Sequence, residues 1–121
     1  MKKLLVVDDE KEICDFLKSF FEERDFSVRV ANSGEEALAA VKKDKPHLVL
    51  LDIHMPGMDG MTVLRELKKN DSHLKVIMVT ALETRDKIEE AIRLGADNYI
   101  TKLLSLEYLE KDVQDKIMQL A

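Results

Sequence analysis

Five polar side chains in this sequence stand at the ends of short apolar runs, and their types could do chemistry together. They are Asp8, Asp9, Asp52, Thr80 and Lys102. Carboxylates can ligate a hard cation such as Mg²⁺ or act as nucleophiles, and a hydroxyl or an ammonium can bind phosphoryl oxygens. Three carboxylates held close together repel one another unless a cation compensates them. The set predicts a Mg²⁺ site that handles a phosphoryl group, if the fold brings the five residues together.

The apolar runs have the length and composition of buried strands. Residues 48–51 are all apolar, which is typical of a strand buried on both faces of a parallel sheet. The turn residues Pro56, Gly57, Asp59 and Gly60 then favour a tight surface loop. The other predicted strands are residues 4–7, 27–31, 76–79 and 98–101.

Amphipathic helical patterns separate these strands. Ser33 and Glu36 form a capping-box pattern for a helix over residues 34–43, and Gly95 is a typical helix C-cap. The other predicted helices cover residues 10–23, 60–70, about 88–95 and 106–120.

Strand and helix alternate five times, which predicts an α/β fold of the flavodoxin-like, doubly wound type. We expect a five-stranded parallel sheet of order 2-1-3-4-5 with five helices, formed by residues 1–121 as one domain that either stands alone or is excised from a longer protein. In this order the first, third, fourth and fifth strands are neighbours at the point where the strand order reverses. Their carboxyl ends therefore place the five polar side chains at one edge of the sheet.

Composition excludes several classes of protein. The chain has 121 residues, of which 45% are hydrophobic and 36% charged, as in a globular domain. No apolar run is long enough to span a membrane, and Met1-Lys2-Lys3 leads into a strand rather than a signal peptide. The single cysteine, Cys14, rules out an internal disulfide and fits a reducing cytosol. The net charge of −5, with scattered Lys and Arg, argues against nucleic-acid binding by this segment. We expect a cytoplasmic protein.

This layout resembles the receiver domain of two-component response regulators over essentially the whole chain. The order, spacing and strand context of five motifs make the resemblance specific. These motifs are Val-Val-Asp8-Asp9-Glu, Leu-Leu-Asp52-Ile-His-Met-Pro56-Gly57-Met-Asp59-Gly60, Val-Thr80-Ala81, Gly95-Ala96-Asp97-Asn-Tyr99 and Ile-Thr-Lys102.

The resemblance implies that Asp52 takes a phosphoryl group from a phosphohistidine of a sensor histidine kinase or a histidine phosphotransfer domain. It also implies that Mg²⁺ is bound by the carboxylates of Asp9 and Asp52 and by the backbone carbonyl of His54. Asp8 would act mainly through a bound water. Lys102 and the cation would stabilise charge on the transferring group.

After transfer, the resemblance implies a switch. Thr80 would bond to the phosphoryl group, and Tyr99 would turn inward and change the surface of the fourth and fifth helices and the fifth strand. A downstream output protein or domain would bind that surface. The resemblance also allows a homodimer formed through the two helices, which the sequence does not decide. The chain would catalyse its own phosphorylation and slow dephosphorylation, with no small-molecule turnover. The side chains of His54 and Leu82 are candidates for tuning the lifetime of the phosphoryl group.

One position departs from the family pattern. Receiver domains usually carry a proline after the lysine, with a cis bond between them, whereas this sequence has Lys102-Leu103-Leu104. A cis bond before a residue other than proline costs roughly 2.5–4 kcal/mol. We therefore expect a trans peptide between Lys102 and Leu103, and a reshaped loop that affects the placement of Lys102.

Three other functions fit the sequence less well than a receiver does. A haloacid dehalogenase-type phosphohydrolase would have a second acid two residues after the nucleophile, where this chain has His54. A flavin or nucleotide binder would need a glycine-rich loop after the first strand, which the sequence lacks. A phosphate-independent interaction module, suggested by Leu103, would more often have lost one of the three acids. Met55, Met58 and Met61 are interpreted as packing residues rather than a binding surface.

Overall fold

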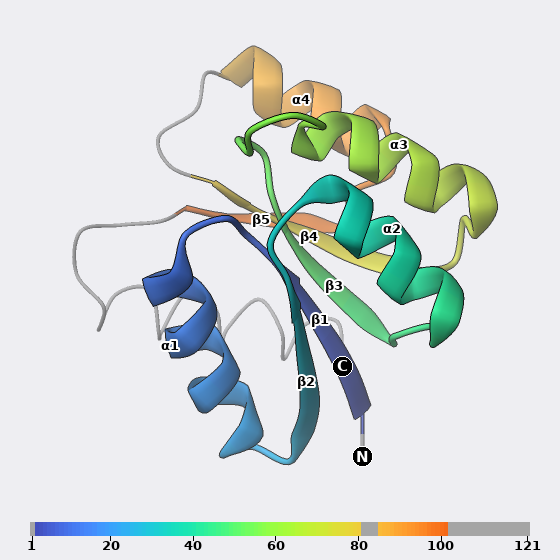
Figure 1. Ribbon diagram of the computed structural model, residues 1–121. Coiled ribbons are helices and arrows are strands. Elements are labelled where there is room, and N and C mark those ends of the chain that lie inside the picture. Colours follow the sequence, from blue (N-terminus) through green and yellow to red (C-terminus); the bar gives the residue numbers. More distant parts are fainter. Residues whose placement is uncertain (1, 81–84, 102–121) are drawn as a thin grey trace.

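The computed structural model describes residues 2–80 and 85–101 of the chain, which contain five strands and four helices (Figure 1). The strands are β1 (Lys2–Val7), β2 (Phe26–Ala31), β3 (Leu48–Asp52), β4 (Lys75–Thr80) and β5 (Asn98–Thr101). The helices are α1 (Lys11–Glu22), α2 (Gly34–Lys43), α3 (Gly60–Asn70) and α4 (Arg85–Arg93).

All five strands form one parallel sheet of order β2-β1-β3-β4-β5, as predicted. The chain starts at the centre, moves out to β2, returns through β3 and continues to β5, so the strand order reverses between β1 and β3. The predicted fifth helix lies outside the described residues, as do Leu82 and the segment from Lys102 onward.

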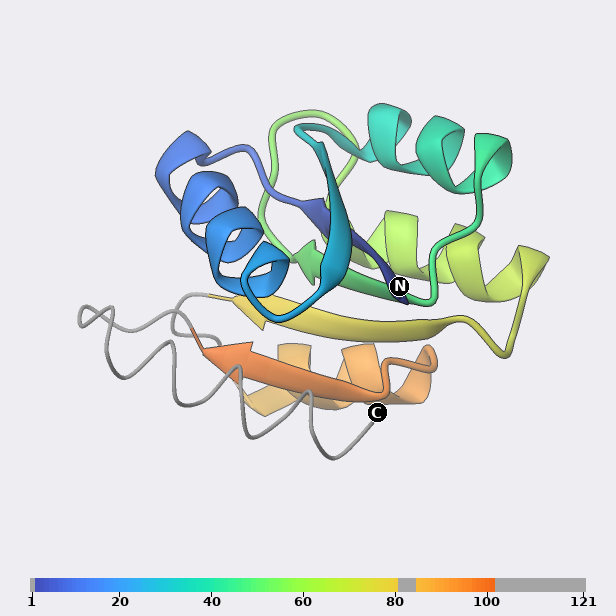
Figure 2. The ribbon, with the colours of Figure 1, turned by 90° about the horizontal axis from the view of Figure 1, so that it is seen from below.

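Among the described helices, α1 covers one face of the sheet, and α2, α3 and α4 cover the other (Figures 1 and 2). Helix α1 packs through Leu17, Phe20 and Phe21 against strand residues that include Leu4 and Leu50. The strand residues next to these in sequence point to the other face of the sheet, where they form a second core cluster with residues of α2, α3 and α4. The sheet is thus the middle layer, and successive residues of β1 and β3 alternate between the two core clusters. All five residues of β3 are buried, which explains its apolar run.

Local signals in the sequence predict most helix ends well. Helix α2 has the predicted bounds, with the Ser33 side chain accepting a hydrogen bond from the Glu36 N–H at 3.2 Å. The other half of the predicted capping box is wrong, because the Glu36 carboxylate accepts from the N–H of Asn32 at 2.8 Å. Gly95 has a φ of 106°, the left-handed conformation that a glycine C-cap allows.

Burial places the single cysteine and tests the interpretation of three methionines as packing residues. Cys14 is 2% exposed and lies on the buried face of α1, in the core. Met55 and Met61 are buried in the cluster on the opposite face, and Met58 packs against it, so these methionines are packing residues. Among the described helices, none has the combination of length and apolar character that a membrane span requires.

Candidate functional site

Three carboxylates meet where β1 and β3 end. Asp8 follows β1 and Asp52 closes β3, and these strands pair with Val7 opposite Leu51. Asp8 is 1% and Asp52 is 3% exposed, whereas Asp9 is exposed to solvent. One oxygen from each carboxylate lies within 4.8 Å of the other two. The fold thus brings together the three acids that the sequence singles out.

This set of donors fits a hard divalent cation. All three groups offer carboxylate oxygens, the ligand type that Mg²⁺ and similar ions prefer. With metal–oxygen bonds of about 2.1 Å, neighbouring ligands of an octahedral Mg²⁺ are about 3.0 Å apart and opposite ligands about 4.2 Å apart. Carboxylate oxygens within 4.8 Å of one another therefore lie near the range that such a site requires. A bound cation would also offset the repulsion among the acids.

Backbone contacts hold Asp8 in place. Its N–H donates to the carbonyl of Ala31 at 3.1 Å, which extends the pairing of β1 with β2 by one residue. Its carboxylate accepts from the N–H of Glu10 at 2.9 Å and so forms the turn into α1. Its carbonyl accepts from the side-chain amide of Asn32 at 3.1 Å and from the Cys14 thiol at 3.3 Å.

Asn32 is a residue that the sequence analysis missed. It stands directly after the second predicted strand, which the predicted order places beside the first. A polar residue at that point could have been recognised as a neighbour of Asp8 from the strand order alone.

The loop after Asp52 folds back over the end of β3. The carboxylate of Asp52 accepts from the N–H of His54 at 3.3 Å, and the N–H of Gly60 donates to the carbonyl of Ile53 at 2.8 Å. A Cβ atom on Gly60 would lie 2.0 Å from the carbonyl oxygen of Asp52 and 2.7 Å from Cα of Ile53. Only glycine permits this approach. The side chain of His54 is exposed.

Helix α3 begins directly after this loop. The Asp59 carboxylate accepts from the N–H of Thr62 at 2.9 Å and caps the helix. That hydrogen bond holds the pKa of Asp59 below its usual value. The start of α2 packs on this loop and on α3, since a Cβ on Gly34 would lie 2.9 Å from Met58 of the loop and 2.7 Å from Val63 of α3.

The remaining predicted site residues come from β4 and β5. Thr80 is the last residue of β4, one position beyond Val79, which pairs with Asp52. Tyr99 is half-buried in β5 and packs against the core cluster on the side of α2, α3 and α4. Lys102, and with it the peptide to Leu103 that we expect to be trans, lies outside the described residues.

Asp97, from the fourth motif, joins three elements. Its backbone N–H donates to the carbonyl of Val76 at 2.8 Å, and its carboxylate accepts from the N–H of Val76 at 2.8 Å. The same carboxylate pairs with Lys68 of α3 at 3.1 Å. These contacts fix the start of β5 against β4 and α3.

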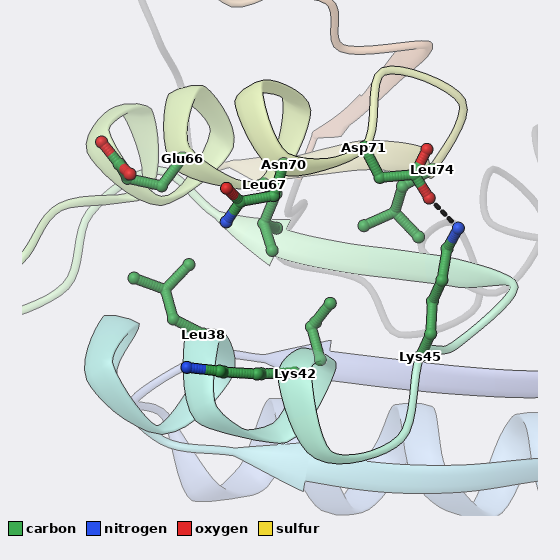
Figure 3. Close-up of a pocket in the computed structure, with 9 residues that line it drawn as sticks. Leu38, Lys42, Lys45, Glu66, Leu67, Asn70, Asp71 and Leu74 are labelled. Carbon is green, nitrogen blue, oxygen red and sulfur yellow. Dashed lines mark ion pairs between the residues drawn. The ribbon is translucent and has the colours of Figure 1, made fainter.

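A pocket of about 560 Å³ lies between α2 and α3 (Figure 3). Leu38 and Val41 line it from α2 and Leu67 lines it from α3. An ion pair between Lys45 and Asp71 crosses one end. Lys45 and Asp71 precede β3 and β4, so the pocket lies toward the amino ends of the strands, away from the acids. None of the predicted site residues lines it.

Comparisons with known proteins agree with this geometry. Residues 4–114 match the response regulator receiver domain family. The receiver domain of the Francisella response regulator 1452 is 32% identical, with a TM-score of 0.84 and 100% of each chain covered.

Two further structures are similar. The Vibrio cholerae chemotaxis protein CheY4 shares the fold, with a TM-score of 0.90, 22% identity, and coverage of 100% of this chain and 99% of that one. The Mn²⁺-bound form of response regulator Rcp1 has a TM-score of 0.87 and 27% identity, with 95% of this chain and 91% of that one covered.

Proposed function

Because this chain belongs to the response regulator receiver domain family, we propose that it is a phosphorylation switch in which Asp52 accepts the phosphoryl group. The observation that carries the proposal is the approach of Asp8, Asp9 and Asp52 to within 4.8 Å at the ends of adjacent strands. Such a cluster is costly without a cation, so its presence favours a receiver that uses one. A phosphate-independent module would have no need of it.

The proposed cation is Mg²⁺, held by the carboxylates of Asp9 and Asp52 and by the backbone carbonyl of His54. Asp8 acts through a bound water, because Mg²⁺ keeps several waters in protein sites. The Mn²⁺ in the similar regulator Rcp1 supports a divalent cation in a site of this kind. When bound, the cation offsets the charge of the acids and draws charge from the phosphoryl oxygens.

The proposed donor is a phosphohistidine of a sensor histidine kinase or a histidine phosphotransfer domain. A carboxylate oxygen of Asp52 attacks phosphorus, and the new P–O bond forms as the P–N bond breaks. The departing ring nitrogen keeps the bonding pair and, with the other nitrogen protonated, leaves as neutral histidine. Asp52 is 3% exposed, and this burial limits the access of water to the acyl phosphate.

Residues of the neighbouring strands complete the proposed switch. Lys102 binds a phosphoryl oxygen, Thr80 donates a hydrogen bond to another, and Tyr99 turns inward in response. The altered surface of α4, β5 and the predicted last helix binds an output protein or domain. We place this single domain, residues 1–121, in the cytoplasm, where it catalyses its own phosphorylation and dephosphorylation.

The test is the intact mass of the protein after incubation with acetyl phosphate, with Mg²⁺ or with EDTA. Acetyl phosphate needs no recognition of a kinase, so it reports on the site itself. We expect one phosphoryl adduct that requires Mg²⁺ and disappears in Asp52→Asn. The matched control is Asp59→Asn, which removes a carboxylate from the same loop but keeps an acceptor for the α3 cap.

The two variants separate the possible outcomes. Loss of the adduct in Asp52→Asn alone supports Asp52 as the acceptor. An adduct that persists in Asp52→Asn contradicts that assignment. A folded wild-type protein that binds Mg²⁺ but takes no phosphoryl group would instead indicate the phosphate-independent module.

A further inference from the structure

We infer that Asn32 is a positioning residue for Asp9 in the cation site, an inference that rests on the proposed function. Asn32 lies in the turn between β2 and α2, and its side-chain amide donates to the carbonyl of Asp8 at 3.1 Å. That carbonyl belongs to the same planar peptide group as the nitrogen of Asp9. Asn32 therefore sets the orientation of the peptide from which Asp9 extends.

The Asp9 side chain depends on this peptide more than its neighbours do. The carboxylates of Asp8 and Asp52 each accept a hydrogen bond from a backbone N–H, from Glu10 and His54. Among the residues that the structure describes, none forms a hydrogen bond or ion pair with the carboxylate of Asp9, which is exposed. The backbone is thus what keeps this carboxylate within 4.8 Å of the other two.

The Asp8 carbonyl lies where the strand pairing of β1 ends, so side chains fix it. The thiol of Cys14, from α1, donates to it from 3.3 Å, and Asn32 donates from the β2–α2 turn. Asn32 is held in turn, because its own N–H donates to the Glu36 carboxylate at 2.8 Å. A chain of two hydrogen bonds therefore runs from the first turn of α2 to the Asp8–Asp9 peptide.

A positioning role differs from a purely structural one in what it changes. If Asn32 only shapes the turn, its loss lowers stability and leaves cation affinity in the folded protein unchanged. If it positions Asp9, its loss weakens cation binding. Saturating cation then restores the reaction, because Asp52 and the ion itself are unaltered.

The experiment compares Asn32→Ala with Asn70→Ala, which removes an exposed asparagine at the far end of α3. Mn²⁺ binding to the metal-free protein is measured by water-proton relaxation, and urea unfolding in EDTA checks the fold. We expect Asn32→Ala to raise the Mn²⁺ dissociation constant about fivefold, the effect of one neutral hydrogen bond. Asn70→Ala should leave it unchanged.

Phosphorylation by acetyl phosphate gives a second readout. In Asn32→Ala the Mg²⁺ concentration for half-maximal rate should rise by the same factor, with the rate at saturating Mg²⁺ within about twofold of wild type. Glu36→Gln, which weakens the bond to Asn32, should shift the same constant less, and Glu35→Gln should not shift it.

An Asn32→Ala protein that is folded and binds Mn²⁺ as tightly as wild type would overturn the inference, whether or not its stability falls. The proposed function can fail separately. If wild-type protein neither binds Mn²⁺ nor accepts a phosphoryl group, the proposed function is wrong and the role of Asn32 falls with it.

Discussion

Replacing Gly60 by alanine should disturb the acceptor site through one methyl group. The new Cβ would lie 2.0 Å from the carbonyl oxygen of Asp52 and 2.8 Å from its carbonyl carbon. Both are backbone atoms, so no side chain can rotate away. An ordinary carbon–oxygen contact is at least about 3.3 Å, so the backbones must separate by about 1.3 Å.

This movement has two costs. It breaks or stretches the hydrogen bond from the Gly60 N–H to the carbonyl of Ile53, now 2.8 Å long. It also forces the start of α3 away from the end of β3. We expect Gly60→Ala to lower the free energy of unfolding by about 2–3 kcal/mol, since overpacking and a lost hydrogen bond outweigh the better helix propensity of alanine.

The effect on function should be larger than the effect on stability. Because Asp52 and the first turn of the loop move together, a displacement of about 1 Å can slow a positioned reaction by about 100-fold. The assays are urea unfolding in EDTA and the rate of acetyl phosphate labelling at saturating Mg²⁺. The measured rate is compared under conditions where both proteins are folded.

Gly57→Ala is the matched control. Gly57 has a φ of 78°, and a Cβ there would meet nothing within 4 Å. Its cost is conformational, about 1 kcal/mol, with no backbone atom of Asp52 displaced. The reasoning is refuted if Gly60→Ala is as stable as wild type, or if it loses no more labelling rate than Gly57→Ala.

Three further outcomes are expected from the same structure. Asp9→Asn should stabilise the metal-free protein in urea titrations, because it relieves the repulsion of Asp9 with Asp8 and Asp52. It should also abolish the rise in melting temperature that we expect Mg²⁺ to cause in wild type. A variant that Mg²⁺ still stabilises would argue against Asp9 as a ligand. Asp97→Asn should lower the free energy of unfolding by about 2 kcal/mol, because it leaves Lys68, whose side chain is 12% exposed, without its charged partner. Lys75→Ala should lower it by under about 0.5 kcal/mol, because the Lys75 side chain is 53% exposed. Equal losses of stability in urea unfolding of the two variants would contradict this account. Asp59→Ala should lower the free energy of unfolding by about 1 kcal/mol at neutral pH, because it removes the α3 cap. The pKa of Asp59 is lower in the folded state, so the stability that its charge contributes is present above the unfolded pKa of 3.8 and is lost as the pH falls through the folded pKa. A difference in stability between wild type and Asp59→Asn that persists in strong acid would contradict this sign.

Much of the fold could be predicted from the sequence because its signals are local. An unbroken apolar run such as residues 48–51 is stable only with both faces covered, and five such runs alternating with helical patterns leave few arrangements besides a doubly wound parallel sheet. Helix α2 has the predicted bounds because Ser33 caps its first turn with an acceptor that the sequence shows directly. The approach of Asp8 to Asp52 then follows from strand order alone.

The contacts that place these groups could not be read in the same way, because they join residues whose distance depends on strand register and loop path. Asn32 reaches the carbonyl of Asp8 across 24 positions of sequence, and Lys68 reaches Asp97 across 29. Glu36 bonds to Asn32 rather than to the cap residue, a choice that the turn geometry makes. The need for glycine at position 60 appears only once the loop has folded back on Asp52. Local patterns thus determine which chemical groups reach the edge of the sheet, and tertiary packing decides their separations, because only there do distant backbones meet.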